Sequence, residues 1–256
     1  MNTGNRSVLG GLILLAGGVF LATPSVISAQ RSRDFLFGEP HFSLAFNLGY
    51  GLPKAGSDIY DFVTDELTVG KSDFSAMVVG GSFGIRVTNR VELSLDVTYA
   101  NSNTRSELRE WVGDDDLPIE QNTSLSRIPV TASVKAFLWD RGRRISQLAW
   151  VPGQWSPFVG VGGGRVFYNF RMNGEFVDEY VDPEAPPIFF DTFKSDGDAG
   201  IFHVLAGAEW SLSPRFYLTG EARYSWAEAE MDRDFVGYDP IDLSGLQGTV
   251  GLALRF

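Results

Sequence analysis

The chain contains 256 residues with a formal net charge of −11, and it has no cysteine and only two histidines. The acidic balance argues against nucleic-acid binding, because phosphate backbones are bound by basic surfaces. The lack of cysteine excludes disulfides, thiolate metal sites and cysteine nucleophiles, and two histidines leave little for a zinc site. The 29 glycines and 13% aromatic residues favour a β-rich protein.

Residues 1–29 are typical of a secretory signal peptide. Arg6 precedes an apolar run over Val8–Ala22, Pro24 interrupts it, and Ala29 supplies the small residue of a cleavage site. The run is short and rich in glycine for a membrane span, although an uncleaved anchor helix is the alternative. We therefore expect cleavage before Gln30 and one mature domain over residues 30–256. No later segment reaches 18 uninterrupted apolar residues, so no transmembrane helix is predicted.

From residue 41 onward, apolar side chains alternate with small or polar ones, which predicts strands with two distinct faces. Eight such segments are found, at residues 42–51, 76–87, 91–99, 128–138, 158–170, 202–212, 216–226 and 246–256. In the segment 158–170, Val161 and Val166 fall on opposite faces. A β-bulge would reconcile these two positions.

Short and long connections alternate between these segments. Residues 88–90 and 213–215 are tight turns, whereas the other connections span about 22, 24, 29 and 17 residues; the exception is Asp140–Gln154, a long connection on the short side. This pattern predicts an all-β fold, namely an eight-stranded antiparallel up-and-down transmembrane β-barrel with short periplasmic turns and long extracellular loops. A soluble lipocalin-like barrel or a two-sheet sandwich is the alternative. Small residues and mid-strand charges on the polar face favour a narrow membrane barrel.

The chain ends on an alternating segment with a terminal phenylalanine. Thr249, Gly251, Leu254 and Phe256 form a pattern that resembles the assembly signal of bacterial outer-membrane barrels. The glycine-rich stretch 157–164 and the Glu221-x-x-Tyr224 pattern also resemble the small OmpA/OmpX-type outer membrane protein β-barrel family. This resemblance implies the outer membrane of a Gram-negative-type bacterium, with its lipid and lipopolysaccharide as surroundings. It also implies that the barrel-assembly machinery recognises the last strand.

Charged residues on the polar face are predicted to form a network inside the barrel. The lumen of eight strands is just wide enough for side chains to fill it, and a charge there must be paired or hydrated. Lys135, Arg86 and Arg223 are the candidate partners of Glu92, Asp96, Glu209 and Glu221. The network either plugs the lumen or acts as a gate whose rearrangement opens a narrow water path.

The long connections are acidic and the short ones are basic. Residues 52–73, 101–124, 172–199 and 227–243 carry net charges of −3, −4, −7 and −5, which would attract divalent cations or a basic extracellular partner or only keep the loops soluble. Arg141, Arg143 and Arg144 would contact anionic lipid headgroups or lie in a solvated turn. The acidic clusters 114–116 and 196–198 lack EF-hand spacing, so no metal site and no cofactor is predicted.

No catalytic site is predicted. His41 and Ser43 form a His-x-Ser pair resembling that of barrel lipid-A deacylases, but the pair lies at the wrong end of the first strand. His203 is expected to make an ordinary hydrogen bond in the lumen. Three functions remain: a structural and surface-interaction protein, a narrow gated pore for ions or small solutes, and, less favoured, a lipid-modifying enzyme.

Overall fold

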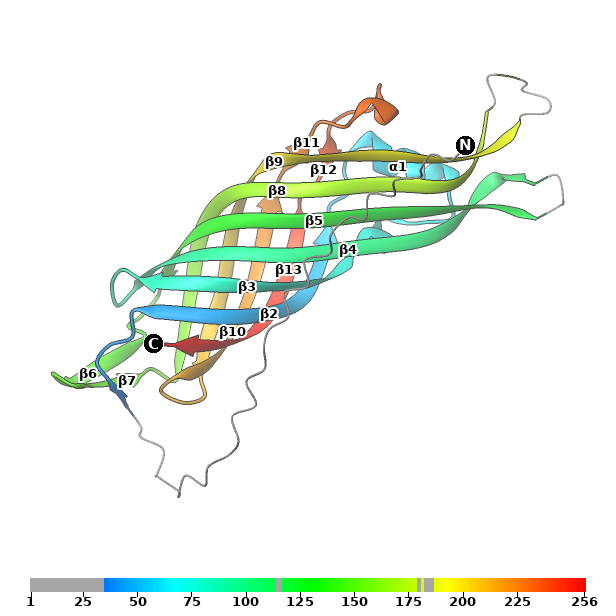
Figure 1. Ribbon diagram of the computed structural model, residues 1–256. Helices are drawn as coiled ribbons and strands as arrows, with labels where there is room; N and C mark the ends of the chain where they lie inside the picture. Colours follow the sequence, from blue (N-terminus) through cyan, green and yellow to red (C-terminus); the bar gives the residue numbers. More distant parts are fainter. Residues whose placement is uncertain (1–34, 114–116, 179–180, 182–186) are drawn as a thin grey trace, which may run out of the picture. The chain divides into compact units, whose positions relative to one another are not determined.

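Eight strands of the computed structural model form one closed antiparallel barrel (Figure 1). The structure describes residues 35–113, 117–178, 181 and 187–256, so the predicted signal peptide and the acidic cluster 114–116 lie outside the described residues. Each strand pairs with its sequence neighbours along the barrel, and β13 closes the ring against β2, which confirms the predicted fold class. The strands are β2 (Phe42–Pro53), β3 (Ala76–Arg86), β4 (Val91–Val112), β5 (Pro118–Phe137), β8 (Trp155–Val177), β9 (Ile188–Ser211), β10 (Phe216–Trp226) and β13 (Gly245–Arg255).

The outer wall carries a continuous apolar belt. In β2, for example, Leu44, Phe46 and Leu48 are each about half exposed, while the alternate residues point into the barrel. Aromatic side chains near the strand ends, such as Tyr50 and Trp226, also face outward. Exposed apolar surface of this extent belongs in lipid, so the belt marks the membrane-spanning part of the barrel. Among the described residues no helix is long and apolar enough to cross a membrane.

Four strands continue well beyond the belt. The expected loops 101–124 and 172–199 are largely extensions of β4, β5, β8 and β9, which Figure 1 shows projecting past the ends of β2 and β3. Within the described residues, these predicted long loops are therefore mostly β-strand. Near the tip of the β8–β9 hairpin, Phe176 lies opposite Phe189 and Val177 opposite Ile188.

The register of β8 explains why Val161 and Val166 lie on opposite faces of the strand. β8 pairs with β5 and β9 without interruption, so the predicted bulge is absent. Val161 is 60% exposed on the belt, and Val166 is 1% exposed inside the barrel. Above the belt, the inner face of β8 changes from glycine to large apolar and aromatic residues such as Val166 and Phe170, because the inward side chains there meet an apolar core.

That core fills the barrel at the end where the long loops were expected. Helix α1 (Asp58–Glu66), the 3₁₀ turns η1 (Lys71–Phe74) and η2 (Arg233–Phe235), and the short pair β11 (Glu228–Ala229) and β12 (Ile241–Asp242) surround it. Ile59 and Tyr60 from α1 are fully buried in one apolar cluster with Phe170 from β8 and Phe235 from η2. We call this cluster the outer plug.

The opposite end of the barrel is covered by the connection 139–154. It forms a hairpin of β6 (Gly142–Ser146) and β7 (Ala149–Pro152), and β7 also pairs with the short strand β1 (Leu36–Phe37). Trp150 from β7 is 1% exposed, and the guanidinium groups of Arg86 and Arg255 lie over its ring at 5.1 and 5.6 Å. We call this hairpin the inner cap.

The outer plug predicts a marked difference between two positions of α1. Ile59→Ala should weaken the docking of the helix by about 2–5 kcal/mol, since it leaves a cavity in packed surroundings. Asp65→Ala on the exposed side of the helix should change the docking by less than about 0.5 kcal/mol. Hydrogen exchange of the α1 amides measures both effects. Equal protection in the two variants would contradict the plug.

Candidate functional site

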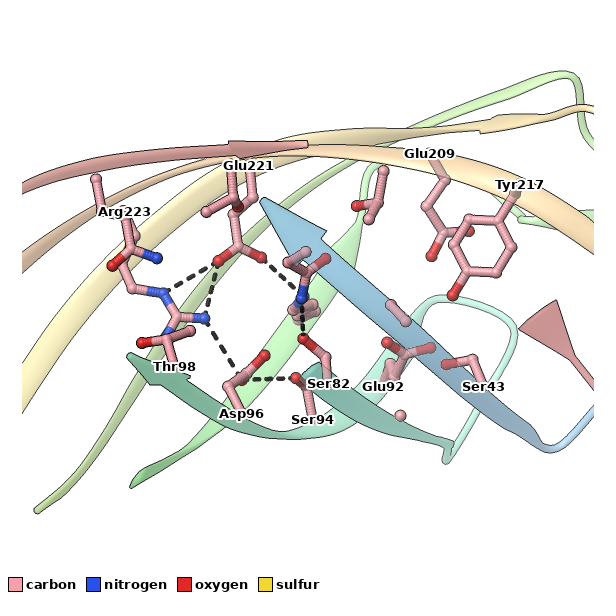
Figure 2. A pocket seen from close by; sticks show the side chains of 17 residues that line it. Ser43, Ser82, Glu92, Ser94, Asp96, Thr98, Glu209, Tyr217, Glu221 and Arg223 are labelled. Atoms are coloured by element: carbon pink, nitrogen blue, oxygen red, sulfur yellow. Dashed lines mark hydrogen bonds and ion pairs between the residues drawn. The ribbon is translucent and has the colours of Figure 1, made fainter. Parts of the chain in front are cut away.

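Two tiers of ion pairs cross the lumen within the belt. In the middle tier, Lys135 from β5 donates to Glu221 from β10 at 2.8 Å. Arg223 lies between Glu221, at 2.8 Å, and Asp96 of β4, at 3.4 Å (Figure 2). Because β10 is separated from β4 by three strands on one side of the ring, these pairs join opposite walls of the barrel.

The lower tier is organised by one arginine of the connection 139–154. Arg141 extends into the lumen and binds two acids, Glu92 of β4 and Glu209 of β9, with 2.7 Å between its Nη2 and Glu209 Oε1. Its guanidinium also lies 4.3 Å from the centre of the Phe137 ring. Arg255 adds a longer contact to Glu209 at 3.9 Å. The inner cap is therefore held to the wall by charge-assisted hydrogen bonds.

The structure brings most of the predicted network together but changes its partners. In the middle tier it joins Lys135 to Glu221, and Arg223 to both Glu221 and Asp96. Arg86 instead pairs with Glu39, at 2.9 Å. The other two acids, Glu92 and Glu209, pair with arginines other than the predicted cations. Arg141 binds both acids, and Arg255 makes a longer contact with Glu209.

The expectation for Arg141 is wrong, because this side chain is 4% exposed and contacts neither headgroups nor bulk water. Arg143 and Arg144 are exposed, and Arg144 pairs with Glu39 at 2.8 Å. The sequence contained a signal for Arg255, whose alternation with Gly251 and Ala253 places it on the inner face. No comparable alternation identifies Arg141 or Glu39, since both lie outside the eight barrel strands.

His203 makes the ordinary lumen hydrogen bond that was expected. Its Nε2 lies 2.8 Å from Ser133 Oγ, and Ser133 is 3.4 Å from Asp96. This is the distance of a nucleophile–base pair, but both side chains are buried beneath the two closed ends, so a substrate has no access to them here. His41 is exposed and Ser43 points into the lumen, and no hydrogen bond joins their side chains in the described part of the chain.

The open space left in the network is small. A cavity of about 30 Å³ lies among the middle-tier side chains and Gln247, which accommodates about two or three water molecules. Outside the lumen, Asp198 pairs with Arg165, and the backbone N–H of Asp196 donates to Asp232. Within the described ranges no group of three or more acids or histidines could hold a metal ion.

Asp242 anchors the loops of the outer plug above the network. Its carboxylate accepts hydrogen bonds from the backbone N–H of Ser244 at 2.9 Å and of Gly56 at 3.2 Å, and Lys54 lies 3.3 Å away. Its carbonyl accepts a bond from the Tyr60 hydroxyl at 3.1 Å. Burial alone would raise the pKa of Asp242, but the bonds from Ser244 and the charge of Lys54 outweigh it and hold the pKa below its usual value.

The predicted assembly residues lie in the strand that closes the barrel. Phe256 is 57% exposed at the edge of the belt, and its backbone exchanges two hydrogen bonds of 2.9 Å with Phe42. Gly251 faces the crowded lumen, where a Cβ atom would lie 2.9 Å from the backbone carbonyl oxygen of Phe46. Glycine is thus required there by packing, whatever recognises the strand during assembly.

Comparison with known proteins gives structural neighbours alone. No protein-family model and no curated protein matches the chain. Among solved structures it is similar to OprG of Pseudomonas aeruginosa (11% identity, 86% of this chain and 98% of the other, TM-score 0.49), to Neisserial surface protein A (12%, 89% and 100%, 0.43) and to outer membrane protein W of E. coli (12%, 85% and 98%, 0.42). These are small bacterial outer-membrane barrels, as the sequence resemblance suggests. At such low similarity the fold assignment depends on the closed sheet itself.

The lower tier predicts unequal effects of two neighbouring arginines. Arg141→Met should destabilise the barrel by about 3–5 kcal/mol, because it leaves Glu92 and Glu209 buried without their main partner. Arg143→Met, on the exposed face of the same hairpin, should change stability by less than about 0.5 kcal/mol. Urea unfolding of the refolded chain in lipid vesicles measures both. A similar small loss in the two variants would show that Arg141 is not the anchor of the cap.

Proposed function

We propose that this chain is an outer-membrane β-barrel that serves as a structural and surface-interaction protein. The observation that carries the proposal is that the barrel is filled from both ends while four strands extend beyond the belt. Between the outer plug and the inner cap, two cavities lined by described residues have volumes of about 30 and 40 Å³. A lumen that side chains fill in this way favours a structural role over a pore.

The projecting strands supply the surface for a partner. Glu175, Asp191, Asp196 and Asp198 lie exposed or partly exposed on the β8–β9 hairpin, and Phe190 is 70% exposed beside them. Exposed acids with an apolar side chain among them suit a basic partner that also offers apolar surface. We propose that an extracellular partner binds at this hairpin, while membrane lipid and lipopolysaccharide surround the belt below it.

A narrow gated pore is the second candidate. Its support is that the two lumen cavities are adjacent, since Thr98 and Gln247 line both of them. A continuous water path through them would need the middle-tier ion pairs, the outer plug and the inner cap to rearrange. For the lipid-modifying function, the separation of exposed His41 from lumen-facing Ser43 offers no support. Recognition of the last strand by the barrel-assembly machinery is retained as part of the proposal.

Planar bilayer recordings distinguish the first two functions. The refolded chain of residues 30–256 should show no discrete openings, because both lumen ends are covered. Lys135→Ala should be silent as well, since the lower tier and the plug remain. Discrete openings in the wild type, with a conductance that Lys135→Ala changes, would establish the pore and overturn the scaffold.

A shortened hairpin tests the surface role. Asn173 and Thr192 are cross-strand partners, so residues 174–191 can be replaced by an Asn-Gly turn that keeps the register. Cells that display this variant should bind polylysine-coated beads more weakly than wild-type cells, and the difference should decline in high salt. The control keeps the hairpin and carries Glu175→Gln, Asp178→Asn and Asp191→Asn. Unchanged bead binding in both variants would contradict a role for the hairpin.

A further inference from the structure

The charged groups of the two tiers pair directly with one another, and one arginine above them has no such direct partner. In the lower tier, Arg86, Arg141 and Arg255 face Glu39, Glu92 and Glu209, and in the middle tier Lys135 and Arg223 face Asp96 and Glu221. Arg127 lies one level higher, between the middle tier and the outer plug. Its guanidinium makes no hydrogen bond and no ion pair with any residue that the structure describes.

The position of Arg127 directs its side chain inward. It occupies the inner face of β5, opposite Ala100 of β4 and Tyr168 of β8. The surrounding wall includes Val78, Val166 and Leu243, all nearly fully buried. Arg127 is half-buried, and guanidinium N–H groups beside apolar side chains are unfavourable without an acceptor, so this guanidinium requires a partner that accepts hydrogen bonds.

The buried acid Asp242 lies in the outer plug and attracts Arg127 at longer range without binding it. Its carboxylate oxygens accept hydrogen bonds from the backbone N–H groups of Gly56 and Ser244 and lie near Lys54. The Arg127 guanidinium therefore has no hydrogen-bond acceptor among the described residues.

A cavity of about 40 Å³ lies next to Arg127. Thr98, Ser225 and Gln247 contribute polar side chains to its wall, and the backbone at Gly51 leaves room beside the Arg127 Nη2 atom. The volume suits a small ion with a water molecule or two and is far below that of a site for a sugar or nucleotide. Hydroxyl and amide donors beside a guanidinium are the groups that bind an anion.

We propose that this cavity binds a small monovalent anion of the halide class against Arg127. The anion would accept hydrogen bonds from the Arg127 guanidinium at the level where the polar network ends and the apolar plug begins. Anion binding to the folded state alone shifts the folding equilibrium by a factor of 1 + [anion]/Kd. The site is independent of the surface role proposed above, and it remains a prediction if that role fails.

Anion exchange at constant ionic strength tests the site in the refolded chain. Replacing isethionate, which is too large for the cavity, by chloride or bromide should raise the folding equilibrium constant about 100-fold when the halide is at 100 times its Kd. Sulfate should have no effect, because it is larger and doubly charged. Arg127→Met should abolish the halide effect, and Arg127→Lys should keep a weaker one. The matched control, Arg165→Met, removes an exposed arginine and should respond like the wild type.

Anomalous diffraction from crystals of the wild-type chain grown in bromide gives a second measurement that does not depend on how the variants fold. A bromide peak in the cavity beside Arg127 supports the proposal. A halide response that is equal in the wild type and Arg127→Met would overturn it. Bromide bound only elsewhere on the molecule would overturn it as well.

Discussion

The structure depends on the narrowness of an eight-stranded ring. A closed sheet of this size has an interior that side chains must fill, and the inner face of the belt provides mostly glycine, serine and threonine. Long charged side chains therefore fill the space, and each needs an opposite charge from another wall. Arg223 and Lys135 reach from different strands to the shared acid Glu221, and Arg141 joins β4 to β9. The same contacts that fill the barrel also tie its opposite walls together.

The two ends of the lumen are closed by different physical means. At the inner cap, guanidinium groups bind carboxylates and stack on Trp150, so closure is electrostatic and directional. At the outer plug, α1 packs Ile59 and Tyr60 into an apolar cluster, so closure there is hydrophobic. The change takes place around Arg127, a charged side chain that faces inward between the middle tier and the apolar core. Each end can therefore be altered by substitution without removing the other.

The belt was predictable from sequence because lipid and lumen impose opposite polarities on alternate residues. That contrast is clear in β4, where Leu93 and Leu95 face lipid and Glu92 and Asp96 face the lumen. Above the membrane both faces change: the outer face meets water and the inner face meets the plug. Residues such as Ser102 and Ser106 are then buried, and Asn103 is exposed, a weak alternation that is easily taken for a loop. Arg141 was missed because its role comes from the path of a connection, which no periodic pattern encodes.

Long projecting strands have exposed edges that would pair with other chains unless they were blocked. On the free side of β9, the carboxylates of Asp234 and Asp232 accept the backbone N–H groups of Lys194 and Asp196, at 3.2 and 2.9 Å. On the free side of β4, Thr68 exchanges two 2.9 Å hydrogen bonds with Glu107. The loops of the outer plug thus cover parts of both edges as well as the lumen. A partner at this surface would then have to recognise the face and the tips of the hairpins, where the acidic side chains and Phe190 are exposed, because strand addition is obstructed at these edge positions.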